Sequence, residues 1–345
     1  MTLLWIDGID SHMSEYIWSA SGGMSYRDGE GRFGGSCISG NYTSTGWVRR
    51  TLAVSDESDT LIVGMAFYGD RTGGDTYLAT IRLMSDAAAT THLTFGFYND
   101  GTTAGYVKRG DTSGTLISNF TAIPYHSWTY IEVKAKLHDS TGTWEVRYNG
   151  NVIGSGSSVD TKNGGTKTTF DTVYIGFGGD GNDQCKIDDI YVCNNAGSVN
   201  NDFHGDCRIE ALYPNGNGTS SQFTGSDGNS TDNYLLVDEA GAPGTADYVQ
   251  DNVAGHRDTY ALANLTTTTG TVYGVQGVHY VAKSDAGTVS VKPAILSSSS
   301  LAYGSTLSPG TTYAGLTQLA ETDPATATAW TISGVNAAEC GVEIV

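Results

Sequence analysis

One glycine-rich stretch carries the side chains best suited to bind a metal ion. Residues 178–183 read GGDGND and place Asp180, Asn182 and Asp183 in a tight loop, with Asp188 close enough to fold back. Oxygen ligands from such a loop suit Ca²⁺. The stretch lacks the glutamate that closes an EF-hand, and DGND is also an ordinary turn sequence. Two interpretations stay open, a calcium site and a plain turn.

Paired carboxylates would indicate a glycosidase, which holds them about 5–10 Å apart across the scissile bond. The nearest acidic pair is Asp188 and Asp189. Neighbours on a strand point to opposite faces, so this pair is not expected to flank one bond. We expect one of them to lie on the surface and the other to bond nearby backbone.

Other catalytic patterns are missing from the sequence. It contains no G-x-S-x-G elbow and no G-x-x-x-x-G-K-[ST] loop. Seven histidines are scattered, none of them in an H-x-x-x-H context: His12, His92, His126, His138, His204, His256 and His279. We therefore expect a protein that is not an enzyme.

Aromatic side chains offer a route to glycans, because sugar rings stack on the faces of Tyr and Trp. Trp47, Tyr68, Tyr98 and Tyr106 fall at expected strand ends or loops. In a chain with 20 Tyr most such residues are expected to pack between strands. The pattern singles out no specific sugar site.

The composition indicates strands and turns. The chain has 46 Gly and 20 Tyr, with only 16% charged residues, and it is rich in Thr and Ser. Such residues favour pleated surfaces and turns. The net charge of −19 would repel the phosphate backbone of a nucleic acid, so no nucleic-acid partner is expected. We interpret the charge as keeping a protein soluble at high local concentration.

The first half predicts an antiparallel jelly-roll sandwich. Its clearest strand is 130–137, where Ile131 and Val133 alternate with Glu132 and Lys134, which point outward. Asn149-Gly150 predicts a hairpin turn. The other expected strands are 60–68, 77–83, 93–98, 144–148, 172–177 and 186–193.

The second half predicts a smaller β-sandwich-like domain. We expect strands at 206–213, 271–282, 288–297, 330–334 and 341–345, a surface loop at 215–233 and a short helix at 323–328. Pro293 suggests an edge strand or a bulge. At 345 residues the chain suits two domains, 1–196 and 206–345, joined by a connector at 197–205.

Five cysteines are expected to be free and mostly buried. Cys185 and Cys193 share one predicted strand and would lie about 26 Å apart, too far for a disulfide. The first residues show no basic segment followed by a long apolar one, so no signal peptide is expected. No apolar run approaches the roughly 18–20 residues that span a bilayer, so no membrane insertion is expected.

Several of these stretches resemble known families. The first half resembles the laminin-G-like, concanavalin-A-like jelly-roll superfamily, through WTYIEVKAKL, TWEVRYNGNVIGSG and KIDDIYVCN. The remainder is similar to the C-terminal part of phage and prophage virion proteins, through NNDFHGDCRIEALYPNGNG, NYLLVDE, DYVQDNVAGHRDTYAL and DPATATAWTISGVNAAECGVEIV.

The resemblance implies a structural protein on the surface of a bacteriophage virion, either a tail fibre or tail-tip adhesin or a capsid decoration protein. It implies other virion proteins as partners, a homo-oligomer, most often a trimer, and contact with host surface polysaccharide. We expect the second domain to attach to the particle and the jelly roll, which has the longer and more aromatic loops, to point outward. Two alternatives remain: a lectin-like module without an assembly role, and a polysaccharide-degrading enzyme.

Overall fold

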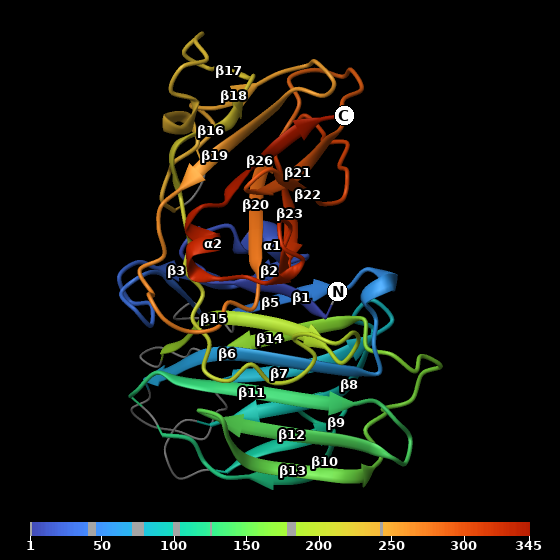
Figure 1. The fold of residues 1–345 in the computed structure, drawn as a ribbon. Helices are drawn as coiled ribbons and strands as arrows, with labels where there is room; N and C mark the ends of the chain where they lie inside the picture. The colour runs from blue at the N-terminus through green and yellow to red at the C-terminus, as the bar shows by residue number, and fades with distance from the viewer. Residues whose placement is uncertain are drawn as a thin grey trace. The chain divides into compact units, whose positions relative to one another are not determined.

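The chain folds into two compact units. The computed structural model describes residues 2–40, 46–70, 79–98, 104–124, 126–177, 184–241 and 244–345. The first unit comprises Met1–Ile9 and Trp18–Ile209, and the second comprises Asp10–Ile17 and Glu210–Val345 (Figure 1).

Sheet A, the first layer of the first unit, has eight strands, and all its pairs are antiparallel. Its order is β13 (Asn151–Val159), β12 (Gly142–Tyr148), β11 (Thr129–Lys136), β6 (Thr60–Asp70), β15 (Gln184–Asn194), β4 (Cys37–Gly40) and β3 (Met24–Arg27), with β1 (Leu3–Asp7) pairing β15.

Sheet B, the second layer, has seven antiparallel strands and lies behind sheet A in Figure 1. Its order is β10 (Thr115–Phe120), β9 (Gly105–Arg109), β8 (Thr90–Phe97), β7 (Ala79–Ser85), β14 (Thr172–Phe177), β5 (Gly46–Thr51) and β2 (Ala20–Gly22). A short 3₁₀ helix, Val54–Asp56, follows β5.

The core of the first unit lies between the two sheets. The core-facing residues of the central strands are fully buried there, among them Val63, Phe67, Ile81, Phe95 and Ile131. Burying one such side chain contributes about 1.5–3 kcal/mol. The expected antiparallel jelly-roll sandwich is confirmed, as is the hairpin at Asn149 and Gly150, both of which have positive φ.

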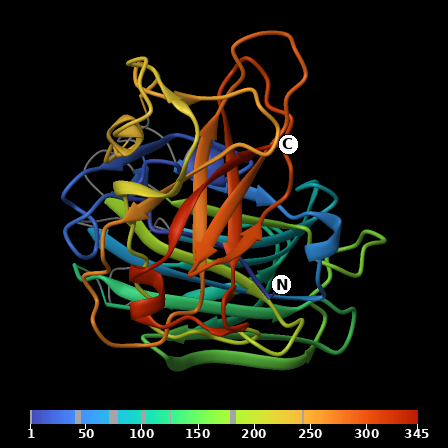
Figure 2. The same cartoon turned by 45° about the horizontal axis from the view of Figure 1, so that its top comes forward.

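The second unit, drawn mostly in yellow, orange and red in Figure 2, is built on one larger sheet and three two-stranded ones. The five-stranded sheet has the order β16 (Pro214–Ser221), β19 (Arg257–Leu262), β26 (Glu339–Ile344), β21 (Val291–Ser297) and β22 (Ser300–Tyr303). The pairs are β17 (Thr224–Gly225) with β18 (Val249–Gln250), β20 (Val275–Val281) with β23 (Ala314–Ala320), and β24 (Thr322–Asp323) with β25 (Thr328–Ala329).

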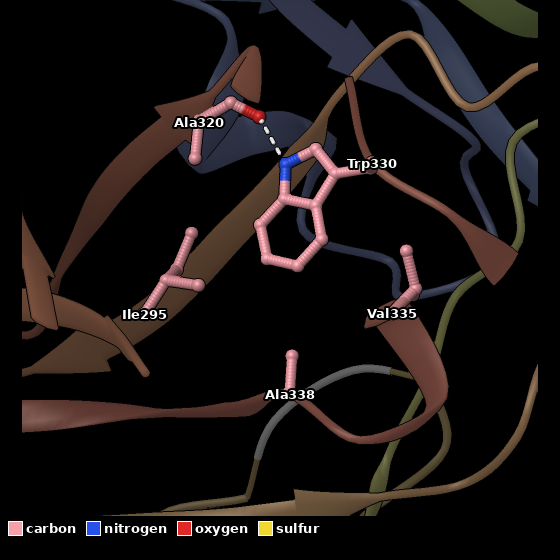
Figure 3. Close-up of a cluster of buried hydrophobic side chains, with 5 residues drawn as sticks. All are labelled: Ile295, Ala320, Trp330, Val335 and Ala338. Carbon is pink, nitrogen blue, oxygen red and sulfur yellow. Dashed lines mark hydrogen bonds between the residues drawn. The ribbon is translucent and has the colours of Figure 1, made fainter. Parts of the chain in front are cut away.

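The helices of the second unit are short: α1 (Ser14–Ile17), a 3₁₀ turn at Asn233–Leu236, and α2 (Ile332–Asn336). Within the described residues, none is long and apolar enough to cross a membrane. One buried cluster surrounds Trp330, whose indole Nε1 donates a 3.0 Å hydrogen bond to the carbonyl of Ala320 (Figure 3). Ile295, Val335 and Ala338 complete the cluster.

Two predictions around residue 214 are wrong. Residues 206–213 form no strand, although their apolar residues alternate, because part of this segment covers the first unit instead of pairing in a ladder. The polar residues 215–221, expected as a loop, belong to β16, which pairs with β19 through two register irregularities. A strand of Asn, Gly, Thr and Ser carries no apolar alternation, so the pattern missed it.

The predictions near the C-terminus were partly wrong. Residues 323–328 form no helix: Asp323 ends β24, residues 324–327 form the turn, and Thr328 begins β25. Residues 332–336 form α2 instead of a strand, because the Thr331 hydroxyl caps the helix by accepting from the Gly334 N–H at 3.0 Å. Pro293 lies in β21, an interior strand, but it precedes the ladder with β22, which begins at Ala294.

All five cysteines are free within the described residues. Cys37, Cys185 and Cys193 are buried, while Cys207 and Cys340 are half-buried. Cys185 and Cys193 lie on β15, as expected. Burial raises the pKa of Cys207 and Cys340 to about 12, which keeps these two thiols protonated and unreactive at neutral pH.

Candidate functional site

Two rows of side chains cross sheet B on the face turned away from the core. The cationic row consists of Arg49, Tyr174, Arg82, Thr94 and Lys108, each directly opposite the next on neighbouring strands. The glycine row lies two residues further along the strands and consists of Trp47, Gly176, Thr80, Gly96 and Tyr106. The intervening residues are fully buried in the core: Val48, Val173, Ile175, Ile81, Phe95 and Val107. Since strand side chains alternate, both rows point outward.

The cations of the first row lie over aromatic rings. The Arg82 Cζ is 4.7 Å from the ring centroid of Tyr174, and the Arg49 Cζ is 5.8 Å from that of Trp47. At the far end, the Lys108 Nζ lies 4.6 Å from the ring of Tyr106. Such contacts hold each cation close to the sheet and order it before any ligand arrives.

Glycines allow the large rings to lie along the sheet. A Cβ on Gly96 would be 2.2 Å from the Tyr106 Cζ, and one on Gly22 would be 2.8 Å from the Trp47 Nε1. Trp47 and Tyr174 stack, with ring centroids 5.6 Å apart and 17° between the planes. Both rings are half-buried, so part of each remains accessible, whereas Tyr106 is only 6% exposed.

Three polar atoms on this face are buried and have no hydrogen-bond partner among the described residues: the Arg49 Nε, the Arg82 Nε and the Thr80 Oγ1. The Thr80 residue is only 1% exposed. A buried polar atom left unbonded costs about 1–3 kcal/mol, and native structures hold few of them. All three lie on the outer face of sheet B but are shielded from solvent, so a ligand would reach them only if these side chains moved.

A second cluster of ionisable residues lies on the outer face of sheet A. Residues 201–209, the covering segment, bury Glu132, which is 0% exposed. Its Oε1 accepts from the Tyr191 hydroxyl and from the Gly205 N–H at 2.8 Å. The His204 ring stacks on Tyr191 at 4.5 Å. Burial, and then the charge of Glu132, raises the pKa of Tyr191. Glu132 does point outward from the core, but it anchors the covering segment and does not reach solvent.

The acidic pair is also engaged by the covering segment. Asp188 and Asp189 are both buried, so the expectation that one of them lies on the surface is wrong. Asp189 has a φ of 49° at an irregularity in the pairing of β15 with β6, which turns its carboxylate toward the Ile209 N–H at 2.7 Å. Asp188 accepts from the backbone N–H of Arg32 at 2.9 Å. Both carboxylates therefore accept hydrogen bonds from backbone N–H groups.

One serine–histidine pair resembles a nucleophile and its base. The Ser85 Oγ lies 2.8 Å from the His92 Nε2. However, the His92 Nδ1 accepts from the Asn163 N–H at 3.1 Å, so the ring proton resides on Nε2 and is donated to Ser85. Burial lowers the pKa of His92, and both residues are fully buried. This pair is unable to activate the serine for attack on a substrate.

The metal candidates Asp180, Asn182 and Asp183 lie outside the described residues. Within the part of the chain that the structure describes, no group of three or more His, Cys, Asp and Glu side chains is arranged to hold a metal ion.

Three of the four aromatic candidates lie on or beside sheet B, with Trp47 and Tyr106 at opposite ends of one row. Trp47 and Tyr106 are in the glycine row, and Tyr98 lies 6.0 Å from Tyr106. Tyr68 lies on sheet A, beside Trp128 and Lys186. Sequence reasoning missed the other eight members of the two rows, among them Arg49, Thr80, Arg82 and Tyr174. The single arginine in the apolar run 79–85 was a usable signal, because a charge in such a strand must face outward.

Comparisons with known proteins yield structural similarity only. No family model matches the chain, and no curated protein matches it. Its structure is similar to an endo-β-1,4-glucuronan lyase from the fungus Trichoderma reesei (11% identity, 56% of this chain and 96% of that one, TM-score 0.41). It is also similar to a protein of unknown function with a galectin-like fold from Bacillus subtilis (11%, 56% and 96%, 0.40), and to a carbohydrate esterase of Shiga toxin-encoding bacteriophage phi24B (14%, 55% and 97%, 0.39). No activity follows from resemblance at this distance.

Proposed function

We propose that the first unit is a glycan-binding module and that its binding surface is the outer face of sheet B. The observation that carries the proposal is the stacked pair of Trp47 and Tyr174, bordered by the half-buried side chains of Arg49 and Arg82. Aromatic faces pack against the apolar faces of sugar rings. The two guanidinium groups are donors, and sugar hydroxyls can accept their hydrogen bonds.

We further propose that the module binds without catalysis. The Ser85–His92 pair has the wrong tautomer for general-base catalysis and no access to solvent. Glu132, Asp188 and Asp189 are bonded to backbone groups and buried. The competing hypothesis is a polysaccharide-degrading enzyme, and some proteins of similar structure are named as lyases or esterases. It predicts new reducing ends or unsaturated products when the protein is incubated with polysaccharides.

The biological setting that we propose is the surface of a bacteriophage virion, with the module contacting host polysaccharide and the second unit joining the protein to the particle as a homotrimer. This setting is supported by the resemblance of residues 200–262 and 323–345 to virion proteins. Labelling the chain with an antibody on intact particles tests the location. Particles that remain unlabelled although the cell lysate contains the protein would contradict it.

The binding proposal is tested on an array of glycans with the full chain. Trp47→Ala and Tyr174→Ala are each expected to weaken binding at least about 30-fold, as loss of a central aromatic contact does. The matched control is Tyr68→Ala, which removes a half-buried aromatic ring from sheet A. Binding that survives both sheet B substitutions, or that is lost equally in the control, would refute the proposed surface.

A further inference from the structure

The two sheets of the first unit differ sharply in charge. The chain has a net charge of −19, yet the seven strands of sheet B, all of whose residues are described, contain no Asp or Glu. They contain five Lys and Arg residues: Arg49, Arg50, Arg82, Lys108 and Arg109. The strands of sheet A carry Asp7, Asp70, Glu132, Glu145, Asp188 and Asp189. The strands of sheet A carry five Lys and Arg residues as well, so the two sheets differ in their acids: sheet B is left with a net positive charge because its strands contain no carboxylate.

The outward cations of sheet B recur on every second strand. Arg49, Arg82 and Lys108 occupy β5, β7 and β9, with Tyr174 and Thr94 between them. Neighbouring strands lie about 4.8 Å apart, so successive cations are about 10 Å apart and the row extends about 19 Å. A row of that length can contact several consecutive sugar units and is longer than the binding site of a single small ion.

The other two cations of the sheet point elsewhere. Arg50 lies over the ring of Trp5 at 4.8 Å, and Arg109 forms an ion pair with Asp160. One acid, Asp111 in the turn after β9, lies close enough to Arg82 and Lys108 that their charges contribute to lowering its pKa. Its carboxylate is already bonded to the N–H and hydroxyl of Ser113, which are the largest causes of its lowered pKa.

We infer that this face binds an acidic glycan: Arg49 and Arg82 bind its carboxylate or sulfate groups while a sugar ring packs on Trp47 and Tyr174. The inference rests on the proposed function and names its ligand class. A guanidinium donates two parallel hydrogen bonds to such a group. Both arginine residues are half-buried, so part of each side chain remains accessible, and neither forms an ion pair with an acid among the described residues.

Long-range repulsion does not oppose this binding at physiological salt. The Debye length is then about 8 Å, so acids elsewhere on the chain are largely screened from a ligand on sheet B. The local cations remain effective because they lie within one screening length of the ligand. Binding is therefore expected to weaken as salt is added, and to do so more steeply than for a neutral glycan.

The experiment measures calorimetric binding of the full chain to four probes: polygalacturonate oligomers, heparin oligomers, neutral dextran oligomers and single-stranded DNA. Arg49→Gln and Arg82→Gln are each expected to weaken binding of the acidic oligomers about 10- to 100-fold. Arg82→Lys keeps the charge without the planar fork and is expected to recover part of the affinity. Lys136→Gln makes the same change of charge on sheet A and should leave binding unchanged.

Each outcome decides one claim. Preference for polygalacturonate assigns the carboxylate and preference for heparin assigns the sulfate, and both support an acidic glycan. Equal binding of dextran, insensitive to Arg82→Gln, would overturn the inference and leave the proposed function standing. Binding of no glycan would overturn both. Binding of DNA as tight as that of the acidic oligomers would overturn the inference in favour of a general polyanion surface. Circular dichroism and thermal melts verify that each variant is folded.

Discussion

The ring of Tyr106 lies against Gly96 on the neighbouring strand, so closely that a Cβ at position 96 would be 2.2 Å from the Tyr106 Cζ. An aromatic ring thus takes the space that a side chain at position 96 would fill. The same arrangement holds Trp47 over Gly22 at the other end of the row. Both rings depend on glycine partners for their orientation.

Gly96→Ala is expected to destabilise the protein by about 1–3 kcal/mol, because the added methyl forces the Tyr106 ring off the sheet. A double-mutant cycle with Tyr106→Ala checks the cause, with urea unfolding as the measurement. In the Tyr106→Ala background the alanine at position 96 should cost less than about 0.5 kcal/mol. An undiminished cost there would show that the ring contact is not the reason for the glycine.

Glu132→Ala is expected to cost about 2–4 kcal/mol in the free energy of unfolding, because it leaves the Tyr191 hydroxyl and the Gly205 N–H without their buried acceptor. Limited proteolysis should then cut within the covering segment. Glu145→Ala serves as the control, since Glu145 is half-buried and paired only with Arg147, and it should cost less than about 1 kcal/mol. Equal losses in the two variants would contradict the anchoring role of Glu132.

Asp258→Ala is expected to destabilise the second unit by about 3–5 kcal/mol. The Asp258 side chain is 0% exposed and accepts hydrogen bonds from Gln222 N, Phe223 N, Asn233 Nδ2 and the Tyr260 hydroxyl. Its removal leaves those buried donors unbonded and frees residues 222–233.

Hydrogen exchange of the Phe223 amide should accelerate strongly. Asp227→Ala, at an exposed loop position, is the control; a similar effect there would refute the assignment.

Glu210 is expected to make stability depend on pH. Burial would raise its pKa, but hydrogen bonds from Thr266 and Thr267 prevail and lower it to about 2, below the unfolded value near 4.5. The unfolded chain therefore binds the proton first as pH falls. The stabilisation is complete above about pH 5 and is lost between about pH 4.5 and 2.

The measurement compares urea midpoints of the protein and of Glu210→Gln across this range of pH. Glu210→Gln should be less stable by about 1 kcal/mol at neutral pH, after allowance for the partial exposure of the carboxylate. The difference should shrink toward zero as the pH approaches 2. A difference that stays constant with pH would show that the carboxylate charge plays no part.

Local patterns were enough for the sandwich strands. Alternation at 130–137 and the Asn149-Gly150 turn predicted β11 and the hairpin of β12 with β13, because β11 and β12 bury their inward residues in the core and the two-residue turn pairs β13 with β12. The same reasoning failed for β16, whose polar residues pair through their backbone, and for α2, where the Thr331 cap outweighs the β-branched residues beside it.

The sequence by itself determined the all-β class, the alternating core and the surplus of acidic charge, because these depend on residue type and spacing of two along a strand. Only the tertiary structure decided which residues share a face. Arg49, Arg82 and Tyr174 are up to 125 residues apart, yet they lie side by side because β14 pairs between β5 and β7. Strand order arises from contacts between distant segments, and no local pattern encodes it. For the same reason the alternation predicted that Glu132 faces solvent, whereas in the folded chain the covering segment lies across it and buries it.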